Sequence, residues 1–112
     1  MGRTDAQPAL SAATFHILLS LAGGDIHGYA IAKEVETATE GAVVLNPATL
    51  YRTLRQLLTD GWILEGEADS EDSRRRAYRL TARGRRIAQA EAQRLVNVIR
   101  IARERRLLPA LG

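Results

Sequence analysis

Apolar side chains recur at helical spacing through the N-terminal part of the chain. A first helix is predicted to open at Ser11, whose hydroxyl can cap free backbone amides, and to stop at the glycine pair 23–24. A second helix should start at residues 25–28 and run to about residue 39. Its candidates for burial, in some combination, are Tyr29, Ile31 and Val35.

The next segment predicts a short strand and then a well-marked helix. The β-branched run 42–45 is bounded by glycine and an Asn-Pro pair, which suits one brief strand. Asn46 is a favoured N-cap residue and the ring of Pro47 already holds the helical φ, so a third helix should begin at Pro47. Its predicted core side is Leu50, Leu54, Leu57 and Leu58. Its opposite side, which contains no acid, is Ala48, Thr49, Arg52, Arg55, Gln56 and Thr59.

Strand-like patterns then flank a charged turn and lead into a long helix. Residues 62–67 and 75–80 predict a hairpin with its tip at 68–74. Thr81 should cap a last helix that extends to about residue 108. Apolar steps of three and four along this helix form a coiled-coil seam, so part of it should pack on another chain. The residues assigned to dimerisation are Ala88, Ala92, Leu95, Val98, Ile99 and Ala102.

This order of elements predicts a mainly α fold with a small β-wing. Helix, helix, short strand, helix, hairpin and long helix together are typical of a winged helix-turn-helix, in which the third helix enters the DNA major groove. We expect residues 1–81 to form the DNA-binding domain and residues 82–112 to form a C-terminal dimerisation helix, within one compact unit.

The net charge of +3 conceals a steep gradient along the chain. Residues 1–50 hold two cations and five anions, residues 51–73 hold two and six, and residues 74–112 hold twelve and two. A strongly basic segment beside acidic ones indicates an anionic partner, for which nucleic acid is the common case.

Composition argues against several other classes of protein. A chain of 112 residues without cysteine has room for one domain and cannot form disulfides, iron–sulfur clusters or Cys-based zinc sites. His16 and His27 have no third ligand nearby, so no metal or other cofactor is expected. Because neither a nucleophile–base pair nor a Gly-rich phosphate loop is present, we do not expect an enzyme. Without a signal peptide or a long apolar run, we expect a cytoplasmic protein with no membrane partner.

Five short segments also resemble a known family: 15–18, 27–31, 47–52, 60–63 and 75–81. The most specific are the Pro-x-Thr-Leu-Tyr-Arg run that starts at Pro47 and the Tyr-x-Leu-Thr-x-x-Gly-Arg run that starts at Tyr78. Over about residues 10–86 the chain resembles the PadR family of bacterial transcriptional regulators.

The resemblance implies a homodimeric repressor of the small subclass that has a single C-terminal helix. It also implies release from DNA by a small-molecule effector, often a phenolic acid or a drug. Family members that hold planar ligands between the subunits use an aromatic residue on the last helix. Residues 82–112 contain none, so we name no effector.

The predicted function is therefore sequence-specific binding of a pseudo-palindromic duplex. The residues assigned to DNA contact are Lys33, Thr49, Tyr51, Arg52, Arg55, Gln56, Arg74, Arg75 and Arg76. Arginine and glutamine can pair bidentately with guanine and adenine. Tyr51 lies at the border of the two helix faces, so its ring could pack on the wing while its hydroxyl meets a phosphate.

Other interpretations of these cations stay open. The outer side of the third helix could be a solvated face, and the wing arginines could pair with Asp69, Glu71 and Asp72. Cations in a first helical turn oppose the macrodipole, so an anionic neighbour, either a DNA phosphate or the wing acids, is expected beside Arg83, Arg85 and Arg86. The alternative function is a winged-helix module that binds an acidic protein without binding DNA.

Overall fold

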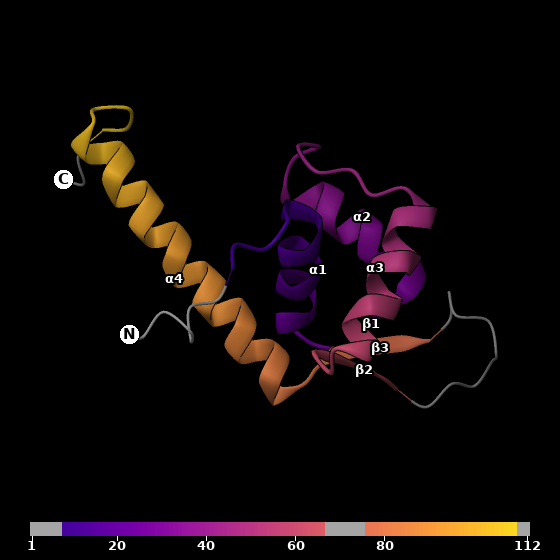
Figure 1. The fold of residues 1–112 in the computed structure, drawn as a ribbon. Coiled ribbons are helices and arrows are strands. Elements are labelled where there is room, and N and C mark those ends of the chain that lie inside the picture. Colours follow the sequence, from indigo (N-terminus) through magenta and orange to yellow (C-terminus); the bar gives the residue numbers. More distant parts are fainter. Residues whose placement is uncertain (1–7, 67–75, 110–112) are drawn as a thin grey trace.

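The computed structural model describes residues 8–66 and 76–109. Within them four helices and three short strands confirm the predicted mainly α fold with a β-wing. In chain order the elements are α1 (Ala12–Ala22), β1 (Ile26–His27), α2 (Gly28–Ala38), α3 (Pro47–Thr59), β2 (Ile63–Glu65), β3 (Ala77–Leu80) and α4 (Ala82–Glu104). Figure 1 shows α1, α2 and α3 gathered around the small sheet, while α4 projects from this body as a single rod.

Side-chain caps begin three of the helices, as the sequence predicts. The cap of α1 is Ser11 Oγ, which accepts from the Thr14 N–H at 3.1 Å. The cap of α3 is Asn46 Oδ1, which accepts from the Thr49 N–H at 2.8 Å. Thr81 Oγ1 caps α4. Since each such cap contributes about 1 kcal/mol, the starts of these helices are defined locally.

The third strand is not where the sequence predicted it. Residues 42–45 form no strand, and β1 pairs instead with β3, with Ile26 opposite Tyr78. β2 lies antiparallel on the other side of β3. The amides of residues 41–43 are used in closing the end of α2, where the Val43 N–H donates to Thr39 Oγ1 at 3.1 Å. The β-branched run therefore serves as a loop that buries Leu45.

Helix α2 differs from its prediction in one core residue. Ile31 and Val35 are buried, but Tyr29 is 63% exposed. Residues four apart share a side of a helix, whereas Tyr29 points about 200° away from Ile31. The core side of α2 therefore excludes the tyrosine.

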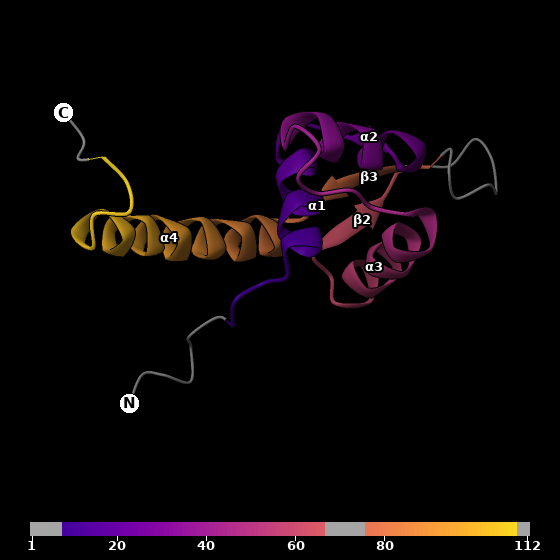
Figure 2. The ribbon, with the colours of Figure 1, turned by 90° about the horizontal axis from the view of Figure 1, so that it is seen from above.

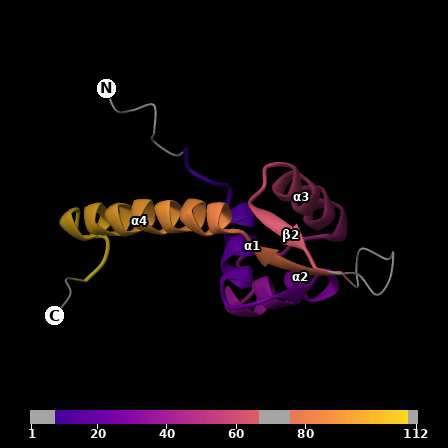
Figure 3. The same cartoon turned by 90° about the horizontal axis from the view of Figure 1, so that it is seen from below.

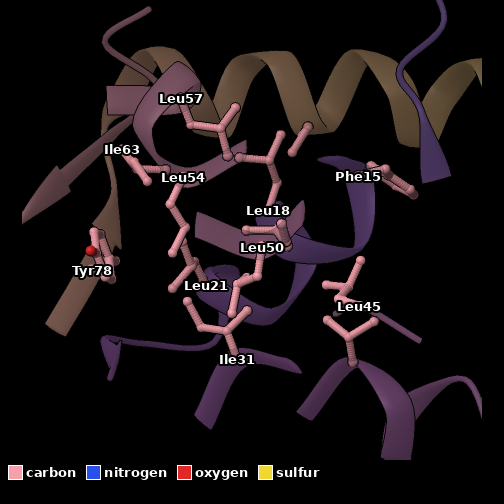
Figure 4. Close-up of a cluster of buried hydrophobic side chains, with 13 residues drawn as sticks. Phe15, Leu18, Leu21, Ile31, Leu45, Leu50, Leu54, Leu57, Ile63 and Tyr78 are labelled. Carbon is pink, nitrogen blue, oxygen red and sulfur yellow. The ribbon is translucent and has the colours of Figure 1, made fainter. Parts of the chain in front are cut away.

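The core lies between the first three helices and the inner face of the sheet (Figure 4). From α3 it takes Leu50, Leu54 and Leu57, none more than 3% exposed. Leu58, also predicted to face the core, is half-buried. Because burial of a leucine stabilises a fold by about 1.5–3 kcal/mol, these three side chains set the rotation of α3 about its axis.

Helix α4 packs on the rest of the chain through its first half and through Leu95. Ala88 is 9% exposed and Glu91 is 3% exposed, whereas Val96 is 58% exposed. At 23 residues the helix is roughly 35 Å long. In all three ribbon views α1 lies between α4 and α3, so the free end of α4 points away from α3 (Figures 1, 2 and 3).

The long helix ends at Glu104, earlier than the predicted residue 108. Arg106 adopts a φ of 65°, and its N–H donates to the Arg103 carbonyl at 3.0 Å. The Leu107 N–H donates to the Ala102 carbonyl at 2.8 Å, which completes a Schellman closure. Within the described parts of the chain, no helix has the length and apolar character needed to cross a membrane.

Candidate nucleic-acid interface

The buried leucines of α3 leave its opposite side facing solvent. Arg52 and Arg55 are exposed there, three residues apart and thus neighbours on the helix surface. Across residues 8–66 and 76–109, neither guanidinium forms an ion pair with an acid. Both are therefore available to an outside anion.

Two other predicted contact residues on α3 already have partners. Gln56 Nε2 donates to Asp60 Oδ1 at 3.0 Å, one turn further along the helix. Thr49 is half-buried in the first turn, where its amide donates to the Asn46 cap. The bond to Asp60 uses one of the two Nε2 N–H groups of Gln56.

A groove separates α3 from the wing, with a cavity volume of about 340 Å³. We call it the α3–wing groove, and its lining residues are Tyr51, Leu54, Arg55, Leu58, Glu65, Arg76 and Tyr78. The half-buried Tyr51 thus lies among wing residues, at the border that its place in the sequence predicted. These described lining residues comprise two cations, one acid, two phenols and two leucines, so the groove is partly polar and partly apolar.

Within this groove a wing arginine is held by an acid of the neighbouring strand. Arg76 Nη1 donates to Glu65 Oε2 at 2.7 Å. One partner of Arg76 is therefore an acid that the sequence analysis did not consider. Arg74, Arg75 and the tip acids at 69, 71 and 72 lie outside the described residues.

Tyr78 is a buried residue of the groove lining and contributes a neutral phenol. Burial raises the pKa of its hydroxyl, and the negative charge of Glu65 and the phenol of Tyr51 raise it further, while Arg76 lowers it. The hydroxyl therefore carries no charge near neutral pH and does not repel an anion.

The remaining predicted DNA contact, Lys33, lies on α2. It is exposed and lines an open hollow on the outer side of that helix, together with Tyr29 and Glu34. Within the two described stretches, no three His, Asp or Glu side chains gather closely enough to hold a metal ion.

One arginine in the first turn of α4, Arg85, has a neighbour that the sequence analysis did not name. Arg85 Nη2 donates to the Ala22 carbonyl at 3.4 Å, at the last residue of α1. The carbonyl end of a helix carries partial negative charge, so it supplies the anionic neighbour that a cation in this position needs. Arg83 and Arg86 are exposed.

Some residues of the predicted dimer seam face the core of the chain, and others face solvent. Ala88 belongs to the hydrophobic core of the chain, and Leu95 packs partly against that core. Ala92, Val98 and Ile99 are exposed, and Ala102 is half-buried. The part of the seam that is open to a partner therefore begins beyond Ala88.

A buried carboxylate in α4 was missed by the sequence analysis. Glu91 accepts from Arg94 Nε at 3.0 Å, from Arg94 Nη2 at 2.6 Å and from the Leu10 N–H at 3.3 Å. The hydrogen bond from Arg94 holds the pKa of the Glu91 carboxyl below its ordinary value, and the same bond raises the pKa of Arg94. The i,i+3 spacing was readable from the sequence, but the distant Leu10 was not.

The start of α4 is locked to the end of α3. Thr81 Oγ1 donates to the Gly61 carbonyl at 2.7 Å and accepts from the Gly84 N–H at 2.9 Å, while the Thr81 N–H donates to the Trp62 carbonyl at 3.1 Å. Gly84 is buried so close to Trp62 that a Cβ would overlap the carbonyl oxygen of that residue. We call these contacts the α3–α4 junction; they account for the Thr-x-x-Gly motif.

A match to a protein family shows which class of protein carries this interface. Residues 17–90 match the model of the transcriptional regulator PadR-like family, which reaches from α1 into α4. The chain belongs to the PadR-like family. It thus has the fold of a DNA-binding transcriptional regulator.

Solved structures share the fold of this PadR-like chain. A transcriptional regulator from Clostridium thermocellum is 27% identical with a TM-score of 0.69, over 83% of this chain and 90% of that one. A PadR family transcription regulator from Clostridium difficile is 22% identical with a TM-score of 0.67, over 84% and 97%. RosR of H. salinarum is 28% identical with a TM-score of 0.60, over 80% and 74%. No curated protein matches the chain by sequence.

Proposed function

We propose that this PadR-like chain is a homodimeric repressor that binds a pseudo-palindromic operator and is released from it by a small-molecule effector. The observation that carries the proposal is the outer side of α3, where Arg52 and Arg55 are exposed without an acidic partner among the described residues. We assign base readout to this side, because an arginine presented on a recognition helix can pair bidentately with guanine.

The second half of α4 supports the dimer. Val98, Ile99 and Ile101 are 40–44% exposed although all three are apolar and lie on one helix. We assign this surface to the two-fold contact, with residues 1–81 left to bind DNA. Half-sites about one helical turn apart, roughly 34–36 Å, would then match the two copies of α3.

The α3–α4 junction supports control by an effector. Thr81 ties the first turn of α4 to Gly61 and Trp62, just after the end of α3. A change in the angle between paired α4 helices would therefore shift the α3 helices as well. A ligand that favours one of the two spacings would then change the affinity for DNA.

Titration of labelled duplex DNA by fluorescence anisotropy tests the proposal. We expect binding to a random duplex at low salt. This binding should weaken steeply as salt is added, because the release of counterions from the DNA then becomes less favourable. Binding to a selected operator should be tighter. Arg52→Ala should weaken operator binding by about 1–3 kcal/mol and relax the preference at one base pair per half-site.

The matched control is Arg105→Ala, which removes the same charge beyond the end of α4. It should leave operator preference unchanged. Absence of DNA binding at low salt would favour the alternative, a module that meets an acidic protein through the same arginines.

A further inference from the structure

The inner face of the wing changes from apolar to charged along its length. Ile63 lies opposite Leu80, and Glu65 lies opposite Tyr78. Alternate residues of a strand share a face, so Arg76 lies on the same side as Tyr78. The Glu65 and Arg76 side chains therefore meet on the face that turns toward α3, inside the α3–wing groove.

An acid at this place is unexpected for a surface that meets DNA. A carboxylate beside the duplex repels phosphates, and removal of such a charge should by itself tighten binding. Glu65 is nonetheless one of the groove residues, and its only described ion pair is with Arg76. The two side chains are 32% and 29% exposed, so the pair is partly shielded from water.

The side chain of arginine explains how an acid can lie on a surface that binds phosphate. A guanidinium has five N–H donors, and the bond from Arg76 Nη1 to Glu65 uses one of them. A side chain that is already held also loses less rotamer freedom when it binds. Among the described lining residues, two guanidiniums, those of Arg55 and Arg76, accompany one carboxylate, which favours an anion in the groove.

We propose that Glu65 is a positioning residue for DNA binding, which holds the Arg76 guanidinium in the α3–wing groove so that Arg76, with Arg55 and Tyr51, receives a backbone phosphate of the duplex. The proposal rests on the DNA-binding function proposed above. Glu65 would thus strengthen DNA binding, although its negative charge alone would weaken it.

The test compares Glu65→Gln in two backgrounds, by operator titration at fixed salt. In the otherwise native full-length chain, Glu65→Gln should weaken binding by roughly 3- to 10-fold, because the neutral amide oxygen accepts a weaker hydrogen bond from the guanidinium than the carboxylate does. In the Arg76→Ala background the same change should no longer weaken binding, because the side chain that Glu65 positions is gone. Glu65→Asp, which keeps the charge but shortens the reach, should also weaken binding in the native background.

The charge control is Glu36→Gln on α2, an exposed acid outside the groove. It should leave affinity within about two-fold or tighten it slightly, as simple electrostatics predicts. Tighter or unchanged binding by Glu65→Gln, or equal weakening in both backgrounds, would overturn the positioning role. If the native protein bound no duplex at all, the proposed function would fail instead, and the two failures are thus distinguishable.

Discussion

Replacement of Gly84 by alanine should disrupt the α3–α4 junction. The new Cβ would overlap the Trp62 carbonyl oxygen and lie 2.8 Å from its carbon. Ordinary contacts between carbon atoms are about 3.5–4.0 Å, so the first turn of α4 has to move by on the order of 1 Å. The backbone atoms of Trp62 cannot rotate aside as a side chain would.

The free energy of this change can be worked from the contacts involved. Overpacking costs about 1–3 kcal/mol. The shift also loses the Thr81 cap and the bond from the Thr81 N–H to the Trp62 carbonyl, about 1 kcal/mol each. Alanine regains about 1 kcal/mol of helix propensity over glycine. The net loss of stability is therefore about 2–4 kcal/mol.

Thermal and urea unfolding followed by circular dichroism would measure the loss. We expect Gly84→Ala to lower Tm by on the order of 10–20 °C for a chain of this size. The matched control is Gly23→Ala, since Gly23 has a φ of −86° and nothing within 4 Å of an added Cβ. The control should be neutral or stabilising by about 0.4–1 kcal/mol. Equal stability of Gly84→Ala and the native protein would refute the close approach.

Three further predictions concern the core, the long helix and its buried acid. Leu54→Ala should lower the free energy of unfolding by about 2–5 kcal/mol in urea; a loss below about 1 kcal/mol would argue against a tightly packed core. Because its folded pKa is depressed, Glu91 contributes stability that is complete above 4.5 and is lost as pH falls through the lowered value. The stability difference between native and Glu91→Gln proteins should therefore shrink in acid melts below that pH, and a constant difference would contradict the pairing with Arg94. Ile99→Glu should halve the mass seen by light scattering while Asn97→Glu does not; a native mass for Ile99→Glu would remove that residue from the dimer contact.

The elements that could be predicted are those with local signals. Asn46 and Pro47 define the start of α3 without reference to the rest of the chain, and helical spacing of its leucines then determines which side faces solvent. The same reasoning placed the hairpin. These signals depend on residues within one or two turns of one another, so the sequence alone carries them.

The features that could not be predicted depend on distant contacts. β1 forms because Ile26 meets β3, whereas the run 42–45 has strand propensity but no neighbouring edge. The early end of α4 depends on a positive φ at Arg106, a residue type that seldom signals one. The Arg76 partner on β2 follows from strand register. The bond between Gln56 and Asp60, in contrast, had a readable i,i+4 spacing and was overlooked.

The central claim is that two copies of this chain present the arginine side of α3 to successive major grooves of one duplex. Selection of bound sequences from a pool of randomised duplexes, followed by footprinting of the enriched site, tests it most directly. The account predicts an inverted repeat whose half-sites lie about 10 base pairs apart on one face of the duplex, with protection lost in Arg52→Ala. Enrichment of no sequence over the starting pool, or of a single unrepeated site, would contradict it.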